Sequence, residues 1–347
     1  MTPFSAPGWI ANRHLQTVWA PLMRHLRPLP RRTERLELAD GDFLRLDHVG
    51  AQERETSPMA ILLHGLAGSG DSVYITGMQQ ALHALGIDSV TMYFRSAGGE
   101  PNRLPRSYHA GDTGDLAAVL TAMHERFPRR PLLAIGYSLG GNVLLKYLGE
   151  RGTATPLRAA CAVSAPLDLA ACAEQLNHGF ARVYRDRLLK ELLGNTLRKR
   201  DAMAAAGDTD HAAALRALGD IASIRTFREY DQRIIAPLHG FRDADDYYAK
   251  SSGRQFLPSI RIPALLVHAR DDPFMTPGVT PTAHEVSESV ELMVSPHGGH
   301  VGFVHGTPWQ PRYWLEEAIP GWLAARAGET ASADAIISSG PGAPAGR

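Results

Sequence analysis

The chain has 347 residues, 44% hydrophobic and 21% charged, a composition typical of a soluble globular protein with one large, well-buried domain. Lysine plus arginine and aspartate plus glutamate each number 36, which argues against an obligatory nucleic-acid or anionic-membrane partner. Two cysteines, Cys161 and Cys172, are too few for a disulfide framework and fit a reducing compartment. Without a signal-peptide pattern or an 18-residue apolar stretch, we expect a cytoplasmic protein.

Residues 1–33 are expected to form an irregular N-terminal lead-in segment. Apolar side chains are scattered along it from Trp9 to Met23. We expect them to pack on the domain or to shape its pocket. A weak membrane or lipid contact through these side chains is a second interpretation.

A β-hairpin is predicted immediately after this segment. Leucines alternate with polar neighbours in residues 34–39 and again in residues 43–49, as in half-buried strands. Asp40-Gly41 lies between the two stretches and is a strong turn signal. The domain should therefore begin with an antiparallel pair of strands.

Short apolar runs then alternate with helical segments from residue 59 onward. Uninterrupted apolar runs bounded by glycine, proline or charge suit strands that are buried on both faces, as in a parallel sheet. Helical patterns lie between them, notably in residues 110–126 and 139–150. This alternation predicts a doubly wound α/β domain. The expected strands are residues 59–63, 89–94, 132–135, 159–163, 264–267 and 290–294.

About a hundred residues interrupt this alternation, and residues 166–262 are predicted to form a helical cap over the active face. Helices are expected at 180–200 and 210–228, and no strand-like run is evident. Four leucines of this insertion either line an apolar acyl pocket or simply pack the cap onto the domain. They are Leu188, Leu189, Leu192 and Leu193.

The motif Gly136-Tyr137-Ser138-Leu139-Gly140 directly follows an apolar run and directly precedes a helical segment. In this strand–turn–helix context, G-x-S-x-G predicts a strained turn that exposes the serine Oγ. Glycine two residues before and two residues after the serine prevents a side-chain clash where the chain approaches itself. The amides at the helix N-terminus favour developing negative charge. Ser138 is therefore the predicted nucleophile.

A serine nucleophile requires a base, which in this fold follows both the serine and the acid along the chain. The loop His297-Gly298-Gly299-His300 directly follows the last apolar run. His300 is the predicted base, since the paired glycines free the loop to bring its ring over the sheet. His297 and His305 remain rivals. The H-x-x-H spacing alone does not predict a metal site.

An acid that orients the imidazole is expected after the preceding strand. Asp271 and Asp272 lie there, immediately before Pro273. Such a carboxylate holds the imidazole tautomer and stabilises the imidazolium ion. Asp272 is favoured, Asp271 is the alternative, and a turn-capping role is open to either residue.

Two backbone amides are expected to form an oxyanion hole. One comes from the loop that ends the first parallel strand, and the other from the residue after the nucleophile. These positions correspond to Leu66 and Leu139, while His64 is interpreted as structural. The glycines near Leu66 match neither a dinucleotide-binding nor a phosphate-binding motif. No cofactor and no metal are expected.

Together these motifs resemble those of YheT-like proteins in the AB hydrolase 4 family of the α/β-hydrolase superfamily. The resemblance implies a triad of Ser138, Asp272 and His300. The chain departs from the family's F-R-S-x-S-G-E loop at Ala97-Gly98. The matching segments are His14-Leu15-Gln16-Thr17, His64-Gly65-Leu66, Phe94-Arg95-Ser96, Gly99-Glu100, 136–142, 164–168, 271–274 and 297–303.

The expected fold is thus an α/β-hydrolase domain over residues 34–326. It has a mostly parallel central sheet, an N-terminal antiparallel hairpin and a helical cap insertion. Residues 327–347 are rich in alanine, glycine, serine and proline, and a disordered tail is expected there.

The function implied is a serine hydrolase that cleaves carboxylic esters with short or medium acyl chains, lipid esters included, through an acyl-enzyme. Its partner is then a small-molecule acyl ester, with no nucleic acid. Two alternatives remain open. One is an acyltransferase that moves the acyl group to an alcohol, and the other is a non-catalytic binding protein on a hydrolase scaffold.

Overall fold

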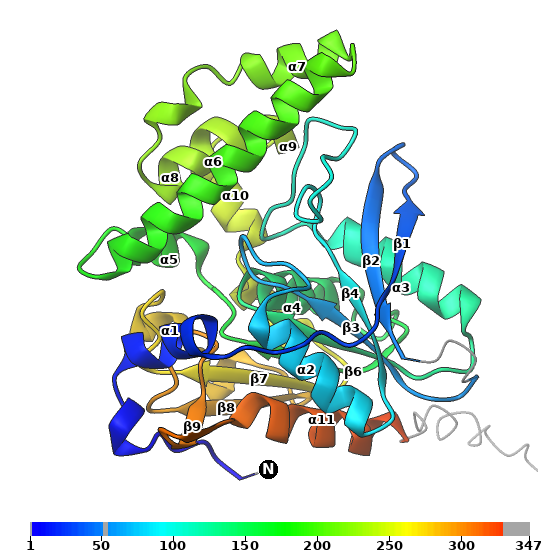
Figure 1. Cartoon of the computed structure of the whole chain (residues 1–347), viewed down its shortest axis with the longest axis vertical. Helices are drawn as coiled ribbons and strands as arrows, with labels where there is room; N and C mark the ends of the chain where they lie inside the picture. The colour runs from blue at the N-terminus through cyan, green and yellow to red at the C-terminus, as the bar shows by residue number, and fades with distance from the viewer. Residues whose placement is uncertain (1, 51–54, 329–347) are drawn as a thin grey trace, which may run out of the picture.

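The computed structural model describes residues 2–50 and 55–328. An eight-stranded sheet in the order β1-β2-β4-β3-β5-β6-β7-β8 forms its centre (Figure 1). β1 and β2 form the predicted hairpin, β2 pairs antiparallel with β4, and the remaining pairs are parallel. The predicted sheet is therefore confirmed. The strands are β1 (Arg32–Glu37), β2 (Phe43–Val49), β3 (Met59–Leu63), β4 (Asp88–Met92), β5 (Leu132–Tyr137), β6 (Leu157–Val163), β7 (Ala264–Ala269) and β8 (Val290–Ser295).

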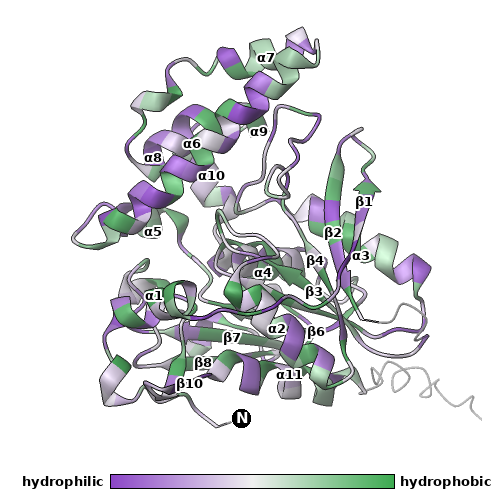
Figure 2. Ribbon diagram, in the orientation of Figure 1, coloured by the Kyte–Doolittle hydropathy of each residue, from purple (hydrophilic) through white to green (hydrophobic). Residues whose placement is uncertain are grey.

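Two hydrophobic cores cover the two faces of the sheet. Alternate side chains of β3 enter different cores: Ile61 packs with α3 (Thr113–Arg126) and α4 (Leu139–Arg151), and Leu62 with α2 (Val73–Ala84) and α11 (Trp314–Ala327). Such two-sided burial explains why the strands are continuous apolar runs, which are coloured as hydrophobic in Figure 2. β3 and β5 are neighbouring parallel strands, so their carboxyl ends meet at one edge of the sheet. The candidate active site lies at that edge.

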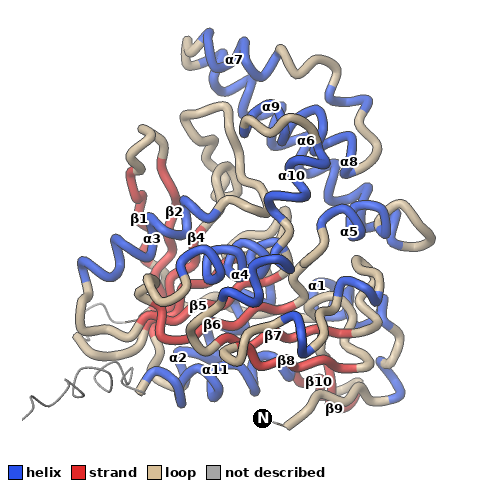
Figure 3. The backbone as a smooth tube through the Cα atoms, turned by 180° about the vertical axis from the view of Figure 1, so that it is seen from behind, coloured by secondary structure: helices blue, strands red, loops and turns tan. Residues whose placement is uncertain are grey.

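The insertion between β6 and β7 is helical and stands above that edge (Figures 1 and 3). Residues 164–263 are all described and contain no strand. The expected helix 180–200 corresponds to α6, which begins one residue later and continues to Ala205, but one continuous helix over 210–228 was wrong. Gly219 adopts a left-handed conformation (φ +74°) and ends that helical stretch. The cap helices are α5 (Leu169–Gln175), α6 (Ala181–Ala205), α7 (Thr209–Arg216), α8 (Phe227–Tyr230), α9 (Ala236–His239) and α10 (Ala244–Ser251).

The N-terminal segment is not irregular throughout, because it contains the helix α1 (Arg13–Met23). The side chain of Asn12 accepts hydrogen bonds from the first amides of α1 and caps it. α1 packs beside a small hairpin, β9 (Val304–Thr307) and β10 (Gln310–Tyr313), whose strands were not among those expected. Within the described residues, no helix combines the length and the apolar content that crossing a membrane requires.

The C-terminal boundary differs slightly from the expected one. Ala327 still belongs to α11. Residues 329–347 of the expected tail lie outside the described residues. Both cysteines are buried and carry free thiols.

Candidate active site

Ser138 occupies a strained turn between β5 and α4. Its backbone angles, φ +51° and ψ −119°, are unfavourable for a residue with a side chain. A Cβ atom added to Gly136 would lie 2.4 Å from the carbonyl oxygen of Gly140. One added to Gly140 would lie 2.7 Å from the oxygen of Leu63. Both motif glycines are therefore required by close backbone contacts.

His300 lies between Ser138 and Asp272. Its Nε2 is 2.9 Å from the Ser138 Oγ, and its Nδ1 is 2.8 Å from the Asp272 Oδ2. With the proton on Nδ1, the imidazole donates to the carboxylate and accepts from the serine hydroxyl. The side chains of His300 and Asp272 are only 10% and 1% exposed. The structure thus brings together the three residues that the sequence singled out.

Asp271 holds the loop that carries His300. Its Oδ1 accepts a hydrogen bond of 3.0 Å from the Gly299 amide, and its Oδ2 lies 3.3 Å from the His297 Nδ1. The other rival base, His305, pairs with Glu317 at 3.0 Å. Both rival imidazoles are therefore engaged away from Ser138.

Leu66 and Leu139 line the cavity beside Ser138. Within the described part of the chain, neither amide has a hydrogen-bond partner. Hydroxyl groups fix the loop around Leu66: Tyr74 accepts from the amide before it at 2.9 Å, and Tyr108 from the amide after it at 3.0 Å. No sequence pattern marked these two tyrosines. The arrangement leaves two free donors beside the serine.

His64 has a structural environment. Its Nδ1 donates to the Gly65 carbonyl oxygen at 2.7 Å, and its Nε2 accepts from the Phe94 amide at 3.2 Å. Complete burial lowers the pKa of His64 to about 4. The imidazole is therefore neutral near pH 7 and links two strand ends.

Helix α1 holds the His300 loop in place. The side-chain amide of Gln16 donates to the Val304 carbonyl oxygen (2.9 Å) and accepts from the Val304 amide (2.7 Å). The Thr17 hydroxyl accepts from the His300 amide at 2.9 Å. A Cβ atom on Gly302 would lie 2.3 Å from the oxygen of Gln16, so this contact needs glycine. The segment expected to pack on the domain therefore also positions the His300 loop.

A cavity of about 550 Å³ lies between Ser138 and the cap. All four leucines pack in or against the core, and Leu188 and Leu192 also line the cavity. The packing interpretation thus holds for all four leucines and the pocket interpretation for two of them. The cavity wall also contains Asp231, whose carboxylate accepts a 2.7 Å hydrogen bond from the Tyr248 hydroxyl. Burial raises the pKa of Asp231 to about 7.

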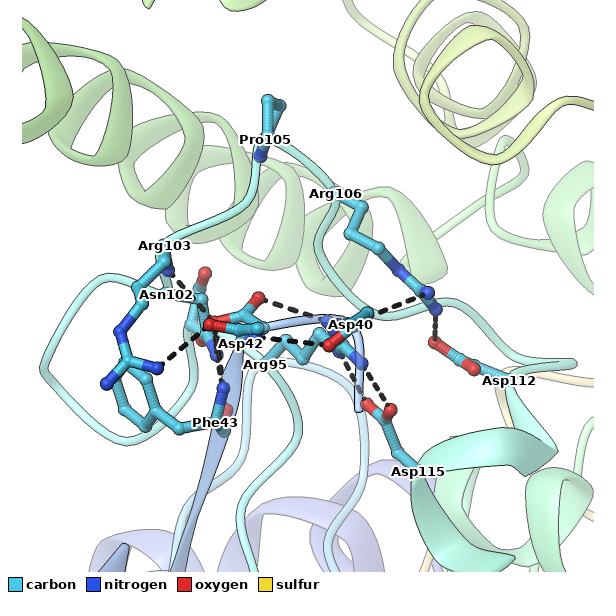
Figure 4. A network of polar contacts seen from close by, with 12 residues as sticks. Asp40, Asp42, Phe43, Arg95, Asn102, Arg103, Pro105, Arg106, Asp112 and Asp115 are labelled. Carbon is cyan, nitrogen blue, oxygen red and sulfur yellow. Dashed lines mark hydrogen bonds and ion pairs between the residues drawn. The ribbon is translucent and has the colours of Figure 1, made fainter. Parts of the chain in front are cut away.

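Arg95, in the loop after β4, holds the β1–β2 hairpin and does not line the cavity. Its guanidinium pairs with Asp40 at 2.8 Å, Asp42 at 3.0 Å and Asp115 at 2.7 Å (Figure 4). These bonds join the β1–β2 turn, the loop and α3 in one network, in which Arg95, Asp42 and Asp115 are buried. The same loop reaches the cavity further along, at Tyr108.

Next to this network, His109, Asp112 and His239 form a cluster whose ligand atoms lie within 4.8 Å of one another. Burial lowers the pKa of His109 to about 3 and that of His239 to about 2, so both imidazoles are neutral. Arg106 already donates to Asp112 at 2.8 Å (Figure 4). The adjacent positive charge of Arg106 opposes a bound cation. The cluster therefore supports no metal assignment.

Comparisons with known proteins agree with this architecture. The family model described as alpha/beta hydrolase fold matches residues 60–307. The YheT protein of Escherichia coli (strain K12), which its name provisionally describes as an esterase, is 40% identical over 90% of each chain. Mouse phospholipase ABHD3 is 32% identical over 86% of this chain and 72% of its own.

Among solved structures, a Pyrococcus furiosus esterase superposes with a TM-score of 0.53. The alignment covers 94% of this chain and 99% of the esterase at 15% identity, a likeness of fold alone. The sequence comparisons carry the stronger conclusion. The chain belongs to the α/β-hydrolase fold family, as a YheT-like member.

Proposed function

We propose that the chain hydrolyses carboxylic esters through an acyl-enzyme formed on Ser138. The observation that carries this proposal is the 2.9 Å approach of the His300 Nε2 to the Ser138 Oγ, with Asp272 on the other ring nitrogen. The esterase and phospholipase names of the relatives support ester-bond hydrolysis.

The proposed reaction begins when the Ser138 Oγ attacks the ester carbonyl carbon and His300 accepts the hydroxyl proton. The carbonyl oxygen becomes an oxyanion and accepts hydrogen bonds from the Leu66 and Leu139 amides. Asp272 stabilises the imidazolium ion. Collapse of the intermediate breaks the ester C–O bond, and His300 returns the proton to the leaving alcohol.

Water then completes the cycle. His300 removes a proton from water as the water oxygen attacks the acyl carbon of Ser138. The second tetrahedral intermediate collapses, the serine regains its proton, and the carboxylic acid leaves. No step requires a metal or a cofactor.

The cavity favours an apolar acyl group. Its volume of about 550 Å³ lies within the range of roughly 300–1,000 Å³ that is common for small-molecule sites. Leu169, Leu176, Leu188 and Leu192 contribute to its wall. We therefore propose esters of short or medium acyl chains as substrates.

Hydrolysis of p-nitrophenyl esters of increasing acyl length tests the proposal. Ser138→Ala should lower kcat by about 10³-fold or more, because the nucleophile is lost. Ser223→Ala, at an exposed serine in the cap, is the matched control and should retain wild-type rates. Equal hydrolysis by wild type and Ser138→Ala would refute the proposal.

Adding a short alcohol to the same assay tests acyl transfer. We expect the free acid to remain the main product at low alcohol concentration. A predominant ester product would identify an acyltransferase. Complete inertness toward every ester in the series would favour a binding protein.

A further inference from the structure

Exposed hydrophobic side chains are concentrated around the mouth of the cavity. The described residues expose seven large hydrophobic side chains, and five of them lie on α1 or at the start of α6. These five form what we call the apolar rim. They are Leu15, Leu22, Met23, Phe180 and Val183.

The two parts of the apolar rim form one surface. The ring of His14 on α1 lies 4.6 Å from the Phe180 ring, and its Nδ1 lies 3.1 Å from the Tyr184 hydroxyl. α1 and the start of α6 lie on the same side of the molecule in Figures 1 and 3. Leu22 of α1 and Tyr184 of α6 also line the cavity. The rim therefore borders an opening that leads to Ser138.

Basic side chains accompany the apolar ones. Arg187 and Lys190 follow Val183 on one face of α6, at spacings of four and seven residues, and Arg13 lies on α1. All three are exposed, and none has an ion pair within the described ranges 2–50 and 55–328.

Acidic side chains near the rim cancel this charge only in part. Asp186 pairs with Arg185. Glu174 lies 2.9 Å from the His178 Nε2, which neutralises it only when the imidazole is protonated. Glu191 remains as an exposed carboxylate at the cavity. Although the whole chain has a formal charge of zero, the surface around the mouth is locally positive.

We propose that the apolar rim docks on an anionic lipid–water interface. Its hydrophobic side chains enter the boundary between headgroups and acyl chains, while Arg13, Arg187 and Lys190 contact anionic headgroups. The cavity mouth then faces the lipid, so an ester can reach Ser138 with little exposure of its acyl chain to water. This benefit to catalysis rests on the proposed function, whereas the docking itself does not.

Sedimentation with sucrose-loaded vesicles tests the docking. The full chain is mixed with phosphatidylcholine vesicles, either pure or containing phosphatidylglycerol. We expect wild type to bind the anionic vesicles more strongly. Leu15→Ser combined with Val183→Ser should weaken that binding by about tenfold or more, because two apolar side chains no longer enter the interface. The control is Leu85→Ser, an exposed leucine at the end of α2 outside the rim, which should bind like wild type.

A second variant tests the charge. Lys190→Glu should weaken binding to anionic vesicles by at least about fivefold, the factor expected for one basic residue near such a surface. It should leave the weak binding to pure phosphatidylcholine almost unchanged. Equal loss on both vesicle types would contradict a role for charge.

Hydrolysis of soluble p-nitrophenyl acetate separates docking from catalysis. The rim variants should hydrolyse it at wild-type rates, and Ser138→Ala should still bind vesicles. Failure of wild type to bind anionic vesicles, or equal binding by wild type and the rim double variant, would overturn the docking proposal. If the rim instead joins two copies of the chain, the double variant would turn a dimer into a monomer in analytical ultracentrifugation, which would also overturn it.

Discussion

The Phe274 ring lies flat against the imidazole of His300. The ring centroids are 4.0 Å apart, and the planes differ by only 5°. The Phe274 amide also donates a 2.8 Å hydrogen bond to the Asp272 Oδ1. Tyr184 packs against Phe274, with centroids 5.0 Å apart. Phe274 therefore contacts His300 by its ring and Asp272 by its backbone, and both contacts restrict how His300 can turn.

Replacing Phe274 should misorient the base. We expect Phe274→Ala to lower kcat by about tenfold or more with a smaller change in KM, since the imidazole gains freedom to tilt away from Ser138. Phe274→Tyr keeps an aromatic face and should remain near wild type. Steady-state kinetics on a p-nitrophenyl ester measures kcat and KM for both variants. An alanine variant with unchanged kcat would contradict a positioning role.

Removing the Gln16 side chain, which bonds to both backbone groups of Val304, should loosen the loop that carries His300. Gln16→Ala leaves the buried amide and carbonyl of Val304 without partners, which should cost about 1–3 kcal/mol for each group in the free energy of unfolding. Urea denaturation measures this loss, and kcat should fall in parallel. Gln80→Ala is the control, because the Gln80 side chain forms an exposed hydrogen bond to the backbone of Arg27. Equal stability of the two variants would show that the Gln16 side chain does not stabilise this loop.

The glycines differ sharply in their tolerance of a methyl group. Gly140→Ala should destabilise the fold by about 3 kcal/mol or more, because its Cβ would lie 2.7 Å from two backbone oxygens. Gly321 lies on α11, and no atom lies within 4 Å of a Cβ added there. Gly321→Ala should instead raise the free energy of unfolding by about 0.5–1 kcal/mol. Thermal melts compare the two. Similar melting temperatures would show that the turn at Ser138 is less crowded than the structure indicates.

Asp231 should make stability depend on pH. Burial raises its pKa from 3.8 in the unfolded reference to about 7, so the folded state binds the extra proton between these values. The contribution of Asp231 to the free energy of unfolding should therefore be largest below about pH 4. It should fall as the pH rises to about 7, by on the order of 3 kcal/mol. Asp231→Asn cannot ionise and should lack this loss. Urea midpoints of both proteins across this range test it, and parallel pH dependence would contradict the assignment.

Much of the fold could be predicted because its signals are local. Apolar runs such as 59–63 are continuous where both sheet faces are covered, and Asp40-Gly41 marks the hairpin turn without any tertiary information. The motif around Ser138 was equally local, since it requires only a strand, a turn and a helix in succession.

The rest depends on contacts between residues distant in the chain. Gln16 and Val304 are 288 positions apart, so neither residue alone indicates the hydrogen bonds between them. Asp271 and Asp272 are adjacent, and only the conformation of the turn determines which one reaches His300. Tyr74 and Tyr108 act through single hydroxyl groups that have no periodic pattern. Pro21 lies inside helix α1, and only Gln16 and Ala20 are buried along it, so local signals did not mark this segment as a helix.

The central claim is that His300 activates the Ser138 hydroxyl for attack. Labelling with a fluorophosphonate probe, followed by intact mass and peptide mapping, tests this most directly, because the probe reacts with activated serines. We predict one adduct per chain, located on Ser138, absent from Ser138→Ala and formed far more slowly in His300→Ala. An unlabelled wild-type chain, or an adduct that persists at another residue in Ser138→Ala, would contradict the account.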